Sequence, residues 1–548
     1  MKSHLNVPPG RARLPALAMA GVLVLGAAAC AGHRPEGTGG PGKVVTKRSA
    51  GPGESVSKQR IGRLKVGVLG AIPTLDPNRN LGAGLYTNSL GLESLLRVGH
   101  DGRLEPWLAT GYEQKSTTVY EYHLRRGVKF SDGSPLTSED VRYSWNYYRA
   151  RGSARAHYYA NVADISTPDE HTVRVTLKTP DASWKYTPAM FWSGVFQKKH
   201  AEAHKATFGQ PGTLVVATGP WKFDSLNPTS GMELTVNEHY WGGRPAVGRI
   251  SVTSYSEDNS LALALRSGEI DLAPGVGSPK AFDATAGKNT VTTVATCATA
   301  LLSLPTRTAP WDDAHVRRAV AYALDREAVV ASTQGRAGAP LQTLISPLLM
   351  RPLGSEERVD KALATVPTYE HDIAKAKAEL AKSKVPHGFS GTFVTAQSFT
   401  PTVEVIVDQL KKVGINLRIQ SMNDTAWASK ATGPAHQRPV TAAETGACSP
   451  DPSFDSIFLG KANTAQGGLN LANYTPPRID ELIASGLTAQ RPAQRLRIYT
   501  DLLKHLGRDV PYVPLYAEGA HYASLKYGIA GFDSYTMNMP WALNVVAE

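Results

Sequence analysis

Residues 119–145 constrain the fold of this chain more than any other stretch. Apolar side chains alternate at Tyr120, Tyr122 and Leu124, while polar residues such as Glu121 stand between them. That alternation has the period of a β-strand with one face buried and the other toward solvent. The stretch therefore predicts a half-buried strand near residues 119–125.

A turn and a helix are expected directly after this strand. Ser131-Asp132-Gly133 has the composition of a turn. Thr137 is expected to be a helix N-cap, with Glu139 and Asp140 close to the positive end of the helix dipole. Physical reasoning alone gives strand, turn and helix, which is compatible with a hairpin in many mixed domains.

The order of residues in this stretch indicates a protein family more specifically than its periodicity does. Residues 124–141, LRRGVKFSDGSPLTSEDV, closely resemble a signature of the solute-binding proteins of bacterial ABC importers, in family 5, which holds the peptide- and nickel-binding members. Further segments match the same family in order: Pro-x-Leu-Ala at 106–109, Asn-x-x-Tyr-Trp at 237–241 and Asp-x-Pro-x-x-Pro-Leu at 509–515. The resemblance covers roughly residues 64–548.

The resemblance implies an α/β, two-lobed, periplasmic-binding-protein-like (type II) fold, with an extra small lobe inserted in the N-terminal domain. The expected boundaries are a signal peptide at 1–29, a flexible linker at 30–60, lobe I at 61–90, the inserted small lobe at 91–210, lobe I again at 211–280, a C-terminal α/β lobe III at 281–510, and a closing segment of lobe I at 511–548.

Hydrophobic periodicity independently indicates alternating strands and helices. Residues 64–68 alternate as a first strand, and residues 86–96 are expected to form a helix. Val316, Ala319, Val320, Ala323 and Leu324 give a buried helical stripe. A second such stripe, at 403–410, is followed by a strand at 415–419, an order that favours an α/β lobe with a mixed or parallel sheet.

The N-terminus has the features of an export signal. Basic residues precede an apolar run at 14–29, which is short for a membrane span. Small residues lead directly into Cys30, as in a bacterial lipobox, although Ala27 stands where the pattern prefers Leu. Acylation of Cys30 would anchor the protein outside the cell, since two acyl chains suffice for stable anchoring. The alternative is ordinary cleavage near Ala-x-Ala. No twin arginine is present, which favours the general secretory route.

Charge does not indicate a nucleic-acid partner. The formal net charge is +12, but the first sixty residues carry +7 of it and the rest only +5. The basic tail favours an anionic membrane surface instead.

Three cysteines, Cys30, Cys297 and Cys448, are too few for a disulfide framework. Cys297 and Cys448 could pair in an oxidising compartment, but the count favours two free thiols.

The expected ligand contacts follow from the resemblance. In peptide-binding relatives an Asp shortly before an acidic-Pro pair binds the α-amino group of the peptide. When the chain is aligned on Asp451-Pro452, that position is Cys448, and Asp451 or Glu444 is left as a substitute. Trp427 is either a pocket wall or a core residue. The full set of expected contacts is Ala71, Ile72, Trp427, Thr445, Gly446, Ala447, Cys448 and Asp451.

No catalytic motif is present in the sequence, and no cofactor is expected. The chain has no Gly-x-Ser-x-Gly elbow, no phosphate-binding loop and no zinc quartet. His200 and His204 have metal-ligand spacing, but a third ligand is not evident, so no metal site is expected.

The expected function is capture of a peptide or peptide-like solute by a monomeric, membrane-anchored protein, and its delivery to the permease and ATPase subunits of an ABC importer. The alternatives are a secreted sensor for a non-peptide solute, such as a nickel chelate, a sugar or an antibiotic-like compound, and a secreted hydrolase.

Overall fold

The computed structural model describes residues 50–547, with gaps at 81–82, 100, 151–152, 154, 278, 280, 283–289, 334–337 and 446–448. The signal peptide, Cys30 and most of the expected linker lie outside the described residues. The last part of that linker is packed: the N–H of Val56 donates to the carbonyl of Leu543 at 2.9 Å, and Ser55 Oγ accepts from the N–H of Ala246. Flexibility through residue 60 was therefore a wrong expectation, because these hydrogen bonds fix the segment before β1.

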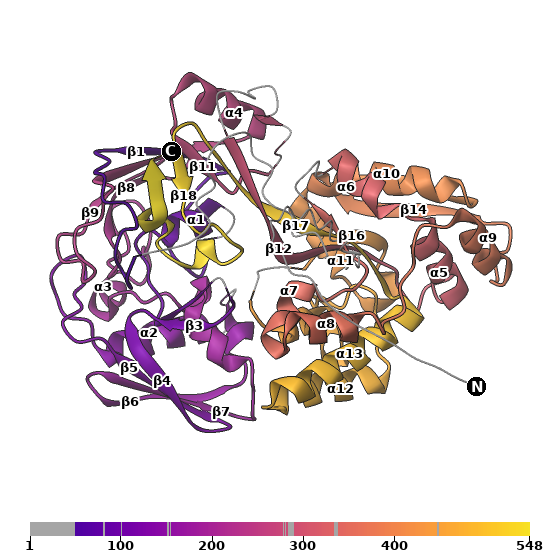
Figure 1. The fold of residues 1–548 in the computed structure, drawn as a ribbon, viewed down its shortest axis with the longest axis horizontal. Helices are drawn as coiled ribbons and strands as arrows, with labels where there is room; N and C mark the ends of the chain where they lie inside the picture. Colours follow the sequence, from indigo (N-terminus) through magenta and orange to yellow (C-terminus); the bar gives the residue numbers. More distant parts are fainter. Residues whose placement is uncertain are drawn as a thin grey trace, which may run out of the picture. The chain divides into compact units, whose positions relative to one another are not determined.

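One mixed sheet organises the described residues (Figure 1). Its strand order is β15-β14-β16-β12-β17-β11-β1-β10-β9-β8, with β13 beside β17. Strand β1 runs parallel to β10 and β11, β14 runs parallel to β15 and β16, and the other pairs are antiparallel. The strands are β1 (Leu64–Leu69), β8 (Trp221–Asn227), β9 (Gly231–Val236), β10 (Arg249–Tyr255), β11 (Leu272–Pro274), β12 (Thr290–Ser303), β13 (Ala339–Pro340), β14 (Phe389–Ala396), β15 (Ile415–Met422), β16 (Val440–Glu444) and β17 (Tyr512–Ser524).

A separate four-stranded antiparallel sheet has the order β4-β5-β7-β6. Two further antiparallel pairs are β2 with β3 and β18 with β19. The strands are β2 (Leu96–Val98), β3 (Leu104–Pro106), β4 (Ala109–Ser116), β5 (Val119–Leu124), β6 (Val162–Asp169), β7 (Thr172–Leu177), β18 (Tyr527–Ile529) and β19 (Val545–Ala547).

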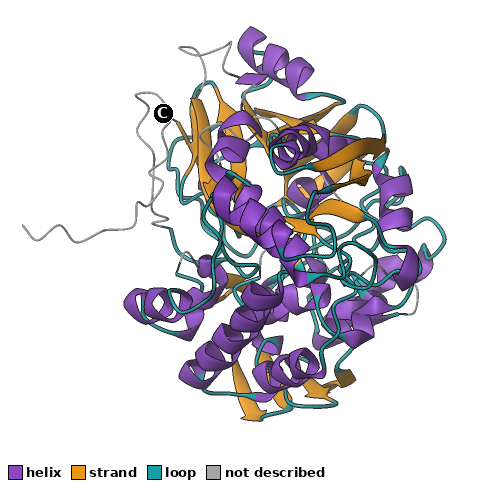
Figure 2. Ribbon diagram, turned by 90° about the vertical axis from the view of Figure 1, so that its right-hand side faces the viewer, coloured by secondary structure: helices purple, strands orange, loops and turns teal. Residues whose placement is uncertain are grey.

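Helices pack against the strands, as the colouring of Figure 2 shows. Helix α10 lies on β14 and β15, and α4 lies on β1, β10 and β11. The helices are α1 (Ala83–Asn88), α2 (Ser138–Arg149), α3 (Lys198–Ala203), α4 (Asp258–Ser267), α5 (Ala314–Ala323), α6 (Arg326–Thr333), α7 (Pro347–Met350), α8 (Glu356–Leu363), α9 (Ile373–Ala381), α10 (Thr400–Lys411), α11 (Asp424–Ala431), α12 (Pro477–Thr488) and α13 (Pro492–Asp509). None of the helices formed by described residues has the length and apolar character that crossing a membrane requires.

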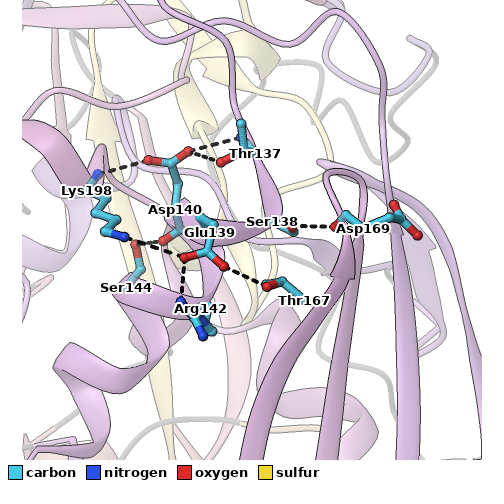
Figure 3. Close-up of polar contacts among 9 residues, drawn as sticks. All are labelled: Thr137, Ser138, Glu139, Asp140, Arg142, Ser144, Thr167, Asp169 and Lys198. Atoms are coloured by element: carbon cyan, nitrogen blue, oxygen red, sulfur yellow. Dashed lines mark hydrogen bonds and ion pairs between the residues drawn. The ribbon is translucent and has the colours of Figure 1, made fainter.

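The strand predicted at 119–125 and the helix predicted after it are present as β5 and α2, with Thr137 as the N-cap. The N–H and Oγ1 of Thr137 donate to Asp140 Oδ2 at 3.0 and 2.8 Å, and the N–H of Lys198 donates to Asp140 Oδ1 at 3.0 Å (Figure 3). Asp140 therefore joins the start of α2 to the start of α3. Glu121, which alternation placed on the solvent side, is buried because Arg174 pairs with it at 2.6 Å.

The expected helix at 86–96 is wrong beyond residue 88. Helix α1 ends at Asn88, and Leu96 begins strand β2. Leu92, Leu95 and Leu96 are buried, so their spacing reflects burial in a turn and a strand rather than one helix face. The buried stripe at 316–324 is confirmed: all five apolar residues of that stripe are fully buried on or beside α5.

The apolar core is divided along the sheet. One cluster draws on residues 61–272 and 522–545, including the four-stranded sheet. Two others draw on residues 297–516 and lie around β14, α10 and α13. Strands β12 and β17 contribute to the clusters on both sides. In β17, Tyr522 belongs to the first cluster and Leu515 to the second; in β12, Val294 packs against the first cluster and Leu302 belongs to the second.

Candidate ligand-binding site

Strands β12 and β17 connect the two halves of the sheet. They pair from Thr290 opposite Ser524 to Ser303 opposite Tyr512, with the register shifting between Ala295 and Thr299. At one end β17 pairs with β11, and at the other end β12 pairs with β16. The middle of this strand pair is therefore where the halves meet, and a bulge there locally bends the strands and redirects side chains.

Two glutamates occupy this meeting point. Glu444 ends β16 opposite Ala300, and Glu518 lies in the middle of β17. A side-chain hydrogen bond joins the two carboxyl groups. Thr296 Oγ1 donates to the carbonyl of Glu518 at 3.0 Å, which fixes the backbone beside the bulge.

The two carboxyl groups hold a proton unusually strongly. Burial raises the pKa of Glu518 to about 9, and the charge of Glu444 adds to the effect; burial also raises the pKa of Glu444. Yet Glu444 is exposed to solvent and Glu518 is only half-buried. Protein atoms therefore desolvate both carboxyl groups, although each residue keeps some contact with solvent. No positively charged group among the described residues contributes to either pKa.

His521 lies three residues further along β17. Its Nδ1 is 2.9 Å from Thr293 Oγ1, and burial lowers its pKa to about 4. The imidazole is therefore neutral at physiological pH and supplies no positive charge to the glutamates.

The sequence-predicted residues around β16 have different surroundings. Thr445 is buried and pairs with Thr299: its N–H donates to the Thr299 carbonyl, and its Oγ1 accepts from the Thr299 N–H at 2.8 Å. Gly446, Ala447 and Cys448 lie outside the described residues. Asp451 is buried in a bidentate ion pair with Arg495, at 2.6 and 2.7 Å. Its carboxylate is thus already neutralised, and Glu444 is the better substitute for a ligand-binding acid.

The other predicted contacts are mostly structural. Ile72 is completely buried in the core, and its N–H donates to the carbonyl of Pro228, so its side chain is not available to a ligand. Ala71 beside it is exposed. Trp427 is half-buried, packs on a core cluster and donates from Nε1 to Thr441 Oγ1 at 2.8 Å. The core interpretation of Trp427 is therefore the one that its contacts favour.

Cys297, in β12, takes part in a disulfide and is buried. The expectation that it is a free thiol is wrong. The two remaining cysteines of the chain, Cys30 and Cys448, lie outside the described residues.

Sequence reasoning missed Glu518 and His521. The signal was present, because β17 is apolar except for these two residues and Ser524. A charged residue in the middle of an apolar strand needs a special environment. The glutamate that completes the pair is distant in sequence, so no local pattern could join them.

One group of three potential metal ligands occurs among the described residues: Glu113, Glu121 and His123, on β4 and β5. Lys115 pairs with both carboxylates and Arg174 pairs with Glu121. These ion pairs account for the acidic groups without an ion.

Comparisons with known proteins identify this architecture. Its likeness to the solved structure of the periplasmic binding protein DppA from Helicobacter pylori, in complex with the peptide STSA, has a TM-score of 0.74 at 23% sequence identity and covers 89% of this chain and 98% of that one. The fold is thus that of a two-lobed, type II solute-binding protein, with a small lobe inserted in the N-terminal domain.

The family model for bacterial extracellular solute-binding proteins, family 5, matches residues 103–465, and the chain belongs to that family. A Brucella ovis protein, named as a peptide-binding protein of an ABC transporter, is 26% identical over 77% of this chain and 79% of its own length. The glutathione-binding protein GsiB of Salmonella choleraesuis is 24% identical over 78% of this chain and 83% of its own. The chain is therefore an exported solute-binding protein.

Proposed function

We propose that this protein captures a peptide or peptide-like solute between its two lobes and delivers it unaltered to the permease and ATPase of an ABC importer. It acts as a monomer, without a cofactor and without catalysis. The proposed lobe boundaries are those that the sequence predicts: lobe I at 61–90, 211–280 and 511–548, the small lobe at 91–210, and lobe III at 281–510. The names of the relatives, which bind peptides or glutathione, support this solute class.

The observation that carries the proposal is the arrangement of β12 and β17. Two long strands are the main covalent links between the halves of the sheet, and they place an accessible carboxyl pair, Glu444 and Glu518, at the meeting point. Halves joined in this way can rotate about the strands, and a solute that contacts both halves stabilises the closed arrangement.

Contacts remote from β12 and β17 support a closing motion. Phe454, in the segment after β16, lies with its ring centroid 5.8 Å from that of Trp192 and 6.2 Å from that of Tyr158. The N–H of Ala182 donates to the carbonyl of Leu487 at 2.8 Å. Residues 158–192 belong to the proposed small lobe and residues 454–487 to lobe III, so these contacts are expected to form when the lobes close.

Mass spectrometry of the solute that co-purifies with the protein from its native host tests the proposal directly. We expect a peptide or a peptide-like compound, and we expect the radius of gyration from X-ray scattering to fall when the stripped protein rebinds it. Recovery of a chemically converted compound would establish catalysis and refute the proposal. A non-peptide solute with the same compaction would favour the sensor or metal-chelate alternative.

The membrane anchor is the second part of the proposal. After acylation of Cys30, residues 31–49 would connect the lipid anchor to the first described residues. A thioether to lipid uses the sulfur of Cys30, so the disulfide of Cys297 would then require Cys448.

A further inference from the structure

The bulge between β12 and β17 is larger than an ordinary one. The two strands are in register as far as Ala295 and again from Thr299. Between these points, residues 296–298 of β12 stand opposite a single residue of β17, Glu518. An ordinary β-bulge sets two residues against one. The extra length of β12 must bend away from its partner here, and we call residues 296–298 the arch.

The hydroxyl of Thr296 closes the arch and fixes it to β17. Its Oγ1 donates to the carbonyl of Glu518 at 3.0 Å and accepts from the N–H of Ala298 at 3.1 Å. A hydroxyl donates one hydrogen bond and accepts two, so one side chain fills both roles. A side chain of the same shape without the oxygen, such as that of valine, would fill neither.

The other end of the arch is fixed to the segment that carries Glu444. The N–H of Thr299 donates to Thr445 Oγ1 at 2.8 Å, and the N–H of Thr445 donates to the Thr299 carbonyl at 2.9 Å. Thr445 follows Glu444 directly in the sequence. Cys297, at the centre of the arch, is buried and held by its disulfide. The arch therefore connects the backbone beside Glu444 to the backbone of Glu518.

The spacing of the two carboxyl groups decides how readily both ionise. Among the described residues, Glu444 is the only charged group that contributes to the pKa of Glu518. Of the elements beside β17, strands β11 and β13 carry no ionisable side chain. In α6, Arg326 donates to backbone carbonyls and Glu327 is exposed to solvent. His521 is neutral at physiological pH. Two carboxylates held side by side repel each other, so a fixed spacing keeps a proton between them.

We propose that Thr296 is a positioning residue for solute recognition: its hydroxyl holds the arch against Glu518 and so keeps Glu518 beside Glu444, where a solute contacts both halves. The proposal rests on the proposed function and deepens it, because it says what sets the spacing of the two groups at which the solute is expected to act. Thr296 acts through Glu518 rather than by contact with the solute.

The first test measures unfolding of the full-length protein in urea, without solute, at pH 5 and at pH 8. Thr296→Val removes the hydroxyl and keeps the shape of the side chain. We expect it to raise the unfolding equilibrium constant at pH 5 by about twofold to twelvefold, the effect of losing one net hydrogen bond. At pH 8 the increase should be smaller by at least about threefold, because carboxyl groups that can move apart ionise more easily in the folded state.

Three variants serve as controls. Thr296→Ser keeps the hydroxyl and should restore the wild-type dependence on pH. Thr306→Val removes another half-buried hydroxyl, which donates to the carbonyls of Ala472 and Asn473 outside the arch, and should destabilise equally at pH 5 and pH 8. In a Glu518→Gln background, the effect of Thr296→Val should also be equal at the two pH values, because glutamine does not ionise.

The second test measures affinity by calorimetry. The probe is the compound extracted from the natively purified protein, returned to the stripped wild type and variants. We expect Thr296→Val to bind it about twofold to twelvefold more weakly, and Thr296→Ser and Thr306→Val to bind it as tightly as the wild type.

The proposal is overturned if Thr296→Val has the same effect at pH 5 and pH 8, if its pH dependence persists with Glu518→Gln, or if its affinity is unchanged. Should the valine variant not fold, comparison of Thr296→Ala with Thr296→Ser decides in the same way. A natively purified protein that yields no compound would contradict the proposed function instead, whereas the unfolding measurements need no solute and decide the role of Thr296 independently.

Discussion

At the scale of single residues, the ionisable groups that protein atoms largely surround fall into two kinds. Asp451 pairs with Arg495, and Glu93 accepts hydrogen bonds from Trp107, Thr218, Tyr240 and Trp241. These groups are satisfied within the protein and hold the fold. Glu518 and Glu444 keep contact with solvent, and no positive charge among the described residues contributes to their pKa values, so they are the groups at which a solute is expected to act.

The Asp451–Arg495 pair gives the first prediction. Asp451→Asn leaves Arg495 buried without its counter-charge, and breaking a buried pair typically costs about 3–5 kcal/mol. We expect the free energy of unfolding in urea to fall by that order. Glu238→Gln, which removes the exposed partner of Arg244, is the control and should cost less than about 1 kcal/mol. Equal losses in the two variants would contradict a structural role for Asp451.

Glu518 gives a prediction about pH. Its pKa in the folded protein, about 9, lies above the ordinary value of 4.5, so the folded state keeps a proton that the unfolded state loses. The contribution of this proton to the free energy of unfolding is therefore fully present below pH 4.5. It is lost as the pH rises toward 9, by at most about 1.4 kcal/mol per pH unit. Solvent that reaches the pair reduces this slope.

We therefore expect Glu518→Gln to unfold at a higher temperature than the wild type at pH 8, and the difference to shrink toward pH 5. The exposed Glu356→Gln should show no such trend. A difference that is constant across this pH range would show that Glu518 is not protonated in the fold.

At the scale of elements, Asp140 connects two helices. It accepts from both the N–H and the hydroxyl of Thr137 at the start of α2, and from the N–H of Lys198 at the start of α3. Asp140→Ala removes all three hydrogen bonds at a buried position. We expect a loss of about 2–3 kcal/mol in urea unfolding. Glu139→Ala removes only partly exposed contacts, with Thr167 and Arg142, and should lose clearly less; the reverse order would contradict the role of Asp140.

Periodicity predicted the elements whose environment is local and uniform. Strands β1 and β15 and helices α5 and α10 were predicted because one face of each meets a single core. Prediction failed where neighbours distant in sequence decide: α1 ends early, and Glu121 is buried by Arg174. The site followed the same rule. Glu444 was noted because it is near Asp451-Pro452, whereas Glu518 acquires its significance only from Glu444, a partner distant in sequence.

At the scale of the whole molecule, the contacts of Phe454 bear on closure. An aromatic pair contributes about 0.5–1.5 kcal/mol beyond its buried area. If Phe454 contacts Trp192 and Tyr158 only in the closed form, its loss shifts the equilibrium toward the open form, and a solute that binds the closed form is weakened correspondingly.

We accordingly expect Phe454→Ala to have a larger radius of gyration with solute present at a subsaturating concentration, and to bind the co-purifying solute about twofold to twelvefold more weakly. Phe389→Ala is the control, because Phe389 packs on Trp311 within one half of the sheet. Weaker binding in both variants, in proportion to lost stability, would show that Phe454 acts on folding rather than on closure.

The choice of disulfide partner for Cys297 depends on whether Cys30 carries a lipid. Peptide mapping under non-reducing conditions should link Cys297 to Cys448, because a lipid-modified Cys30 has no sulfur left for a disulfide. Cys30→Ser should release the protein from membranes into the soluble fraction and leave the Cys297 linkage unchanged. A Cys297–Cys30 peptide, or membrane association that persists in Cys30→Ser, would contradict the lipid anchor.

A disulfide that closes so long a loop typically stabilises by about 2–4 kcal/mol, so Cys297→Ser should unfold at a lower temperature yet stay on the membrane.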